Sequence, residues 1–154
     1  MAFVPVVLMM TGCGSSQSSM ERAAETQRAV AEVLANKHFY ININRMHPVR
    51  YNSRTVSYGF FLELKGDTLV SCLPYMGQAY QVAYGESEGL NFVAPVMNYS
   101  ETRAKKNMTR IELNVRTKED LYYYLIEIYD SGSAFIRVRG QNRDSISFDG
   151  EIVR

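Results

Sequence analysis

The alternation of apolar and polar residues predicts β-strands along most of the chain. Ile111, Leu113 and Val115 alternate with polar residues, as in a strand that has one buried and one solvent-exposed face. Residues 121–129 are apolar on both faces except at Glu127, so we expect this strand to lie in the middle of a sheet. Short polar turns separate such segments, and short connections join antiparallel neighbours.

The clearest local prediction is a hairpin around Gly66-Asp67. In residues 58–65, Glu63 and Lys65 lie on the face opposite to Leu62 and Leu64, and residues 68–73 return as the next strand. One face of this strand is expected to have the alternating residues Tyr58, Phe60, Leu62 and Leu64. A glycine in the first central position suits a type II′ turn, whose twist matches that of the two strands.

Prolines mark the ends or irregularities of two further strands, because proline cannot donate to a ladder of hydrogen bonds. A strand that starts at Phe39 is expected to break at His47-Pro48, and residues 49–55 are expected to form a polar connection. In residues 90–102, Pro95 indicates an edge or a bulge in a long or bent strand.

Residues 18–36 have the periodicity of an amphipathic helix. Ser18 and Glu21 have the spacing of a capping box, which satisfies backbone groups in the first turn of a helix. Val30 and Leu34 fall on one side, and the alanines around them make that side shallow. We therefore expect this helix to lie on the surface or at the end of a sheet.

These elements predict a mainly β (α+β) fold. One N-terminal helix precedes an antiparallel meander of about eight strands. The strands are expected to form a strongly curved sheet, which is either an open or closed barrel or a two-layer sandwich. A parallel α/β sheet is disfavoured, because no helix-length crossovers separate the later strands.

The start of the chain has the pattern of a secretory signal, in which an apolar core of about 7–15 residues precedes small residues. Residues 2–10 supply the apolar core, and Gly12 is the small residue before Cys13. The segment from Met10 to Cys13 resembles the Leu-small-small-Cys lipobox, whose cysteine becomes lipidated. Because no Lys or Arg precedes Arg22, we expect the true start to lie upstream.

The predicted organisation has three parts. Residues 1–12 are a signal peptide, residues 13–19 are the lipidated cysteine with a flexible tether, and residues 20–154 are a single β-rich domain with the N-terminal helix. Gly14 follows the cysteine, which by resemblance to lipoprotein sorting signals favours a periplasm-facing outer-membrane protein held by its lipid anchor. The alternative is an apolar N-terminal helix or strand that merely contains Cys13.

Composition excludes several classes of function. The 17 basic and 16 acidic residues are balanced, which argues against a nucleic-acid binder held by phosphate contacts. Two histidines are too few for a recognisable zinc site, and no nucleophile elbow, phosphate loop or dinucleotide fingerprint is present. We therefore assign no catalytic residue, metal or cofactor. Cys72 is expected to be a buried structural thiol, and Glu127 to pair with Arg137 or Arg139.

Three tyrosines in residues 73–85 are the candidate binding residues. Tyr75, Tyr80 and Tyr84 follow Pro74 in a segment that includes two glycines, and aromatic loops on rigid scaffolds often bind ligands or partners. The structural alternative is a loop that folds over a barrel mouth, with the tyrosine rings covering the core and their hydroxyls bonded to the backbone.

Two segments resemble a known family. They are Leu73-Pro74-Tyr75-Met76-Gly77-Gln78-Ala79-Tyr80 and the final strand from Ser145 to Ile152. Both are similar to segments of small bacterial envelope lipoproteins known only as a domain of unknown function. The resemblance covers roughly residues 25–154. Met76 stands where that family usually has an aromatic residue, and Gln78 where it usually has arginine.

The resemblance implies a Gram-negative envelope lipoprotein and carries over no catalytic residues. Our first hypothesis is a non-enzymatic module, tethered to the outer membrane, that binds a small apolar ligand or an envelope protein. One alternative is a hydrolase that uses carboxylates or tyrosines at a barrel mouth. Another is a structural or inhibitor-like module that engages its partner through a sheet edge.

Overall fold

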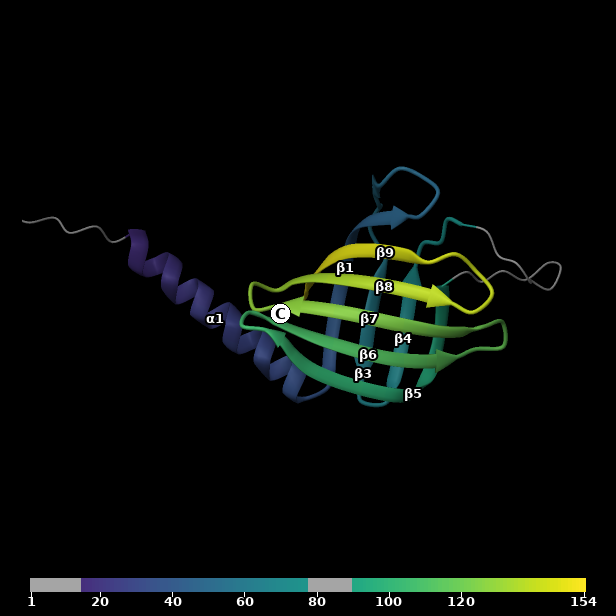
Figure 1. The fold of residues 1–154 in the computed structure, drawn as a ribbon. Coiled ribbons are helices and arrows are strands. Elements are labelled where there is room, and N and C mark those ends of the chain that lie inside the picture. Colours follow the sequence, from purple (N-terminus) through teal and green to yellow (C-terminus); the bar gives the residue numbers. More distant parts are fainter. Residues whose placement is uncertain (1–14, 78–89) are drawn as a thin grey trace, which may run out of the picture.

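A computed structural model describes residues 15–77 and 90–154 (Figure 1). One helix, α1 (Ser15–Ala35), precedes nine strands. The strands are β1 (His38–Pro48), β2 (Arg54–Thr55), β3 (Phe61–Lys65), β4 (Thr68–Leu73), β5 (Leu90–Lys105), β6 (Met108–Arg116), β7 (Leu121–Tyr129), β8 (Ser133–Gly140) and β9 (Ile146–Ile152).

The strands form a closed barrel. Every neighbouring pair from β3 to β9 is antiparallel and consecutive in sequence, and β1 pairs with both β3 and β9. This second pairing closes eight strands into a ring, while β2 adds a short ninth strand to the far half of β1. The predicted meander with one helix is confirmed, and among the predicted shapes the chain adopts the closed barrel.

Side chains fill the interior of the barrel, as expected for a ring of eight strands. Inward positions alternate along the strands, so that β7 has every second residue buried. The largest fully buried side chains include Phe39, Tyr122, Tyr124 and Phe148. Inside this apolar core, the Tyr124 hydroxyl donates to Ser71 Oγ at 3.1 Å, and Ser71 in turn donates to the Leu90 carbonyl at 2.7 Å.

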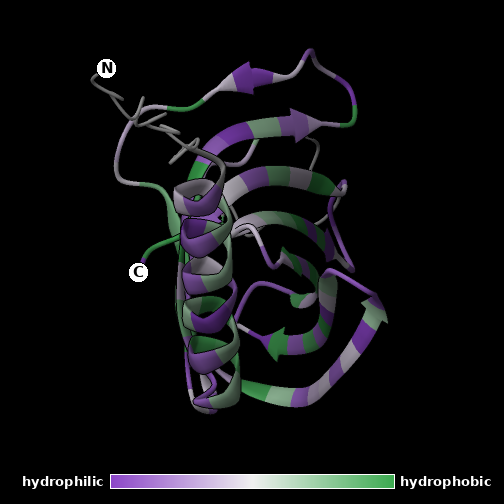
Figure 2. Ribbon diagram, turned by 90° about the vertical axis from the view of Figure 1, so that its left-hand side faces the viewer, coloured by the Kyte–Doolittle hydropathy of each residue, from purple (hydrophilic) through white to green (hydrophobic). Residues whose placement is uncertain are grey.

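The helix covers one end of the barrel, with its apolar stripe against the strands (Figure 2). Thr26, Val30 and Leu34 are buried and recur every four residues, which places them on one side of the helix. The helix starts at Ser15, before the expected Ser18. Residues 15–19, predicted as flexible tether, are therefore helical. The helix described here lacks an apolar stretch long enough to cross a bilayer.

The predicted hairpin is present, with Lys65 paired to Thr68 across the turn. Gly66 has φ 59°, and the positive φ falls on the residue that a type II′ turn requires. The predicted strand was too long at its start, because Tyr58 is 99% exposed and β3 begins at Phe61.

Two proline predictions had different outcomes. The expected irregularity near Pro95 is present as a bulge between Val96 and Asn98, where β5 leaves β4 and continues along β6. The expected break at His47-Pro48 was placed too early, because β1 continues through Pro48 and pairs there with β9. A terminal strand position tolerates proline, since its missing donor breaks no inner ladder.

Candidate functional site: a groove on the outer wall of the barrel

A groove of about 320 Å³ lies on the barrel wall and is lined mainly by outward-facing side chains of β6, β7 and β8. This outer groove is lined by Glu112, Asn114, Tyr123, Tyr124, Leu125, Arg137, Arg139 and Ser145. Its volume is at the lower end of the range for small-molecule sites. Because its walls belong to three hydrogen-bonded strands, the lining side chains are held on a rigid surface.

Strand register arranges six of these residues as two parallel rows. In one row Asn114 lies opposite Tyr123, and Tyr123 lies opposite Arg139. In the other row Glu112, Leu125 and Arg137 occupy the same three strands. One side of the outer groove therefore has two arginines, the other side has a carboxylate and an amide, and apolar side chains lie between them.

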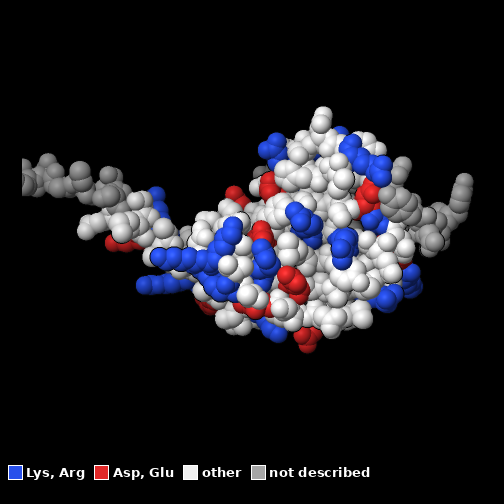
Figure 3. Space-filling view, viewed as in Figure 1, with Lys and Arg blue, Asp and Glu red and all other residues white. Residues whose placement is uncertain are grey.

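Aromatic rings support the two guanidinium groups. The Arg139 Cζ lies 4.9 Å from the centroid of the Tyr123 ring, and the Arg137 Cζ lies 5.8 Å from that of Phe135. Such cation–π contacts position a guanidinium while leaving its N–H donors available at the edge. Figure 3 shows Lys and Arg side chains distributed over this face of the barrel.

The nearby carboxylates have other partners. We expected Glu127 to pair with Arg137 or Arg139, but it accepts hydrogen bonds from Arg110 at 2.8 and 3.2 Å. The reason is register: Glu127 lies between Arg110 on β6 and Phe135 on β8. In the described part of the chain, Arg137 and Arg139 form no ion pair.

The barrel mouth, at the end opposite α1, has a buried arginine that is paired with carboxylates. The Arg143 side chain is only 3% exposed and lies between the rings of Tyr75 and Tyr122, with its Cζ 5.2 and 5.3 Å from their centroids. Its guanidinium pairs with Glu119 at 3.0 Å and with Asp120 at 3.5 Å.

Asp120 anchors this mouth cluster, which comprises Tyr75, Glu119, Asp120, Tyr122 and Arg143. Its fully buried carboxylate accepts hydrogen bonds from the backbone N–H groups of three residues, Leu121, Gln141 and Asn142. A buried charge needs such partners. Burial also raises the pKa of Tyr122 to about 12, although the Arg143 charge opposes the shift.

Of the three candidate tyrosines, Tyr75 alone lies within the described residues. It is half-buried in the mouth cluster, and its hydroxyl donates to the Asp144 carbonyl at 3.3 Å. This is the arrangement expected when the segment folds over the barrel mouth. Tyr80 and Tyr84, like the lipidation site Cys13, lie outside the described residues, so their roles stay predictions.

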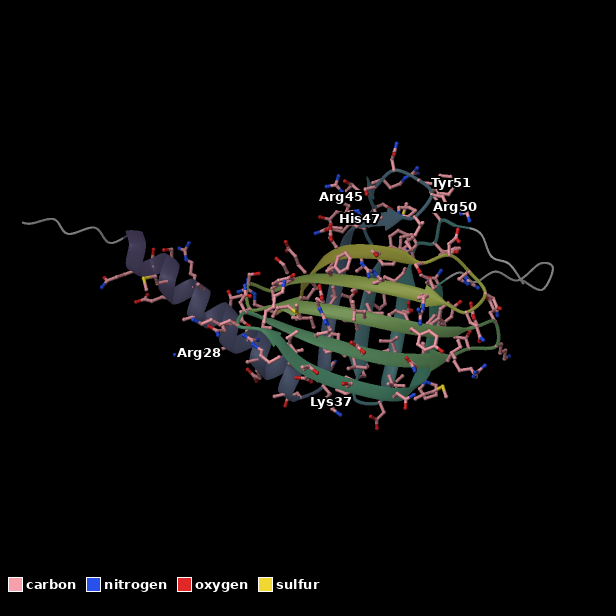
Figure 4. The ribbon with its side chains drawn as sticks, viewed as in Figure 1. Arg28, Lys37, Arg45, His47, Arg50 and Tyr51 are labelled. Carbon is pink, nitrogen blue, oxygen red and sulfur yellow. The ribbon has the colours of Figure 1, made fainter. Side chains whose placement is uncertain are left out.

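A Ser–His–Asp chain lies on the projection formed by the end of β1 and the β2 connection, where Figure 4 labels His47. The two ring nitrogens of His47 lie 2.7 Å from Ser53 Oγ and 2.7 Å from Asp149 Oδ2. Sequence reasoning missed it, because Asp149 is 102 residues away from His47. The Asp149 side chain is 46% exposed, so water competes for these contacts.

Other chemistry is sparse in the described residues. They contain no group of three or more His, Cys, Asp or Glu side chains suited to a metal ion. Cys72, expected to be buried, is half-buried on the outer side of β4, and its thiol lies 3.6 Å from the Gly59 carbonyl.

Comparisons with known proteins agree on one family. The family model described as "Domain of unknown function (DUF4251)" matches residues 21–152. Among solved structures, the fold is similar to a DUF4251 family protein from Bacteroides eggerthii DSM 20697, with a TM-score of 0.64 and 10% identity. That similarity covers 84% of this chain and 88% of the other. No curated protein matches the chain significantly.

Proposed function

Because the chain belongs to the DUF4251 family of domains of unknown function, we propose that it is a lipid-anchored envelope protein that binds a ligand in the outer groove. The family supplies no activity, so the proposal comes from this chain's own residues. The anchoring part rests on the signal and lipobox pattern that ends at Cys13. The binding part rests on the outer groove, one side of which has two arginines that lie against aromatic rings.

The helix supports the anchoring part of the proposal. It starts two residues after Cys13 and contains 21 residues, which span about 31 Å at 1.5 Å per residue. Met20 is 72% exposed, and the buried stripe begins only at Thr26. The first turns of α1 therefore extend away from the barrel (Figure 1). In this arrangement they hold the barrel away from the membrane surface as a stiff spacer.

The observation that carries the binding part is the contrast between the filled barrel interior and the outer groove, in which charged and polar side chains flank apolar ones. The inward positions of the barrel are occupied by side chains such as Ile41, Leu62 and Ile126, each 0% exposed. A small apolar ligand would have to displace them, at the cost of their packing. The outer groove offers hydrogen-bond donors and acceptors on a preformed surface instead.

The anchoring proposal is tested by intact mass spectrometry of the protein isolated from its native membrane fraction. We expect a chain that begins at Cys13 and has the added mass of acyl groups, and a Cys13→Ser variant that leaves the membrane fraction. An unmodified Cys13 in a membrane-free protein would contradict the proposal.

A serine hydrolase is the second candidate function, favoured by the contacts of His47 with Ser53 and Asp149. A nucleophile and a base at hydrogen-bond distance are the first requirement of such an enzyme. A fluorophosphonate probe tests it directly. Labelling that disappears in Ser53→Ala would establish the hydrolase. From a binding protein we expect equal background labelling of the unaltered chain and the Ser53→Ala variant.

Strand addition at a sheet edge has less support. After Pro95, β5 pairs with β6 but no longer with β4. That stretch includes Arg103 and Lys105 and has bulges at both ends. Charged side chains and bulges are features that discourage pairing with another chain. The outer groove is therefore the better candidate for recognition.

A further inference from the structure

We infer that the outer groove binds a small zwitterion of tripeptide length, with its carboxylate on Arg137 and Arg139 and its ammonium group near Glu112. This inference rests on the proposed binding function and specifies the chemical class of the ligand. It depends on the two rows of side chains across β6, β7 and β8.

The arginine side of the outer groove is suited to a carboxylate. Both guanidinium groups rest against aromatic rings, and no described carboxylate pairs with either. Charge-assisted hydrogen bonds from arginine to a carboxylate are frequently bidentate and are stronger than neutral hydrogen bonds. Arg139, stacked on Tyr123 at 4.9 Å, is positioned before a ligand arrives, which reduces the entropy lost on binding.

The opposite side of the outer groove favours a cation. Glu112 is exposed and forms no ion pair with the residues that the structure describes. It lies two strands from Arg137, which corresponds to about 10 Å at about 4.8 Å per strand. A carboxylate at that position attracts an ammonium group and repels a second anion, so polyanions such as nucleic acids are disfavoured.

The space between the two charged sides limits the size of the ligand. The outer groove has a volume of about 320 Å³, and Tyr123 and Leu125 lie between its charged sides. An extended tripeptide spans about 10 Å between its charged ends, which matches the distance between the two sides. Asn114 and Ser145 line the same groove and supply hydrogen-bonding groups for peptide amides.

The experiment is isothermal titration of the full chain in nonionic detergent at low ionic strength, where charge contacts are least screened. The probes are triglycine, acetyl-triglycine without the ammonium charge, triglycinamide without the carboxylate, and inorganic phosphate. We expect triglycine to bind most tightly and the loss of either charged end to weaken binding about tenfold or more.

Three variants assign the two ends. Arg139→Gln and Arg137→Gln should weaken triglycine binding about tenfold or more. Glu112→Gln should abolish the preference for triglycine over acetyl-triglycine. Arg116→Gln is the matched control, because Arg116 is an exposed outward arginine of β6 that does not line the outer groove. It should bind triglycine like the unaltered chain.

Several results would overturn the inference. Equal binding of triglycine and acetyl-triglycine, or tighter binding of phosphate, would make the groove a simple anion site. Absence of triglycine binding, or an equal loss of triglycine affinity in Arg139→Gln and Arg116→Gln, would show that the outer groove does not bind a zwitterion. None of these results changes the acylation state of Cys13 or its membrane fractionation, so they leave the anchoring proposal standing.

Discussion

Two arginine environments in this barrel share contacts with aromatic rings but differ in burial and in carboxylate partners. Arg143 in the mouth cluster is 3% exposed and paired with Glu119 and Asp120. Arg137 and Arg139 on the outer wall are exposed and supported by rings rather than by carboxylates. A buried guanidinium with two carboxylates is committed to the fold, whereas an exposed one without a carboxylate retains donors for a ligand.

The same comparison explains why Tyr75 is an uncertain guide to function. Tyr75 and Tyr123 each lie against an arginine, at 5.2 and 4.9 Å respectively. Tyr75 contacts the buried Arg143 and donates to a backbone carbonyl, so these contacts stabilise the mouth cluster. Tyr123 contacts the available arginine and lines a groove. The role of such an aromatic ring therefore depends on whether the arginine that it contacts already has a carboxylate partner.

The largest effect is expected from Asp120→Ala in the mouth cluster. The substitution removes the acceptor of three backbone N–H groups and one partner of the buried Arg143. Loss of one partner of a buried pair costs about 3–5 kcal/mol of unfolding free energy. Urea unfolding followed by circular dichroism measures it. A loss below about 1 kcal/mol would show that the mouth cluster is not committed to the fold.

A smaller effect is expected at alkaline pH. Burial raises the pKa of Tyr122 to about 12 and also raises that of Tyr124. Between the unfolded pKa of about 10 and the folded value, the unfolded chain loses protons that the folded protein keeps. Stability is therefore unaffected below about pH 10 and falls above it, by about 1.4 kcal/mol per pH unit for each such tyrosine.

Urea unfolding at a series of pH values measures this slope. Tyrosinate absorbance reports the ionisation itself without interference from tryptophan, which the chain lacks. Tyr122→Phe is the control and should reduce the slope above pH 10. A stability that stays constant up to about pH 12 would contradict the inward placement of these hydroxyls.

The smallest effect on stability is expected from Arg137→Gln and Arg139→Gln. Both residues are exposed and have no described carboxylate partner, so each substitution should change the unfolding free energy by less than about 0.5 kcal/mol. The same variants should lose triglycine affinity. A large loss of stability would assign these arginines to the fold and end the contrast with Arg143.

Local elements were predictable because their determinants lie close together in the sequence. Three elements depend only on residues that are near one another in the sequence. They are the Gly66-Asp67 hairpin, the alternation in residues 111–115 and the apolar stripe through Val30 and Leu34. Membership of a family with unknown function was also predicted correctly. Boundaries were less predictable, as the early start of α1 and the continuation of β1 to Pro48 show.

The sequence by itself determined the single helix and the order of the eight barrel strands, but not the two-residue β2, which lies within the expected polar connection. In strands such as β6 it also determined which side chains face inward, because strand periodicity assigns every second residue to one face. Only the tertiary structure decided that β1 closes on β9, that Glu127 pairs with Arg110, and that Asp120 meets Arg143. Periodicity specifies faces but not lateral neighbours. Lateral neighbours follow from register and ring closure, which bring together residues that are far apart in the sequence, such as His47 on β1 and Asp149 on β9.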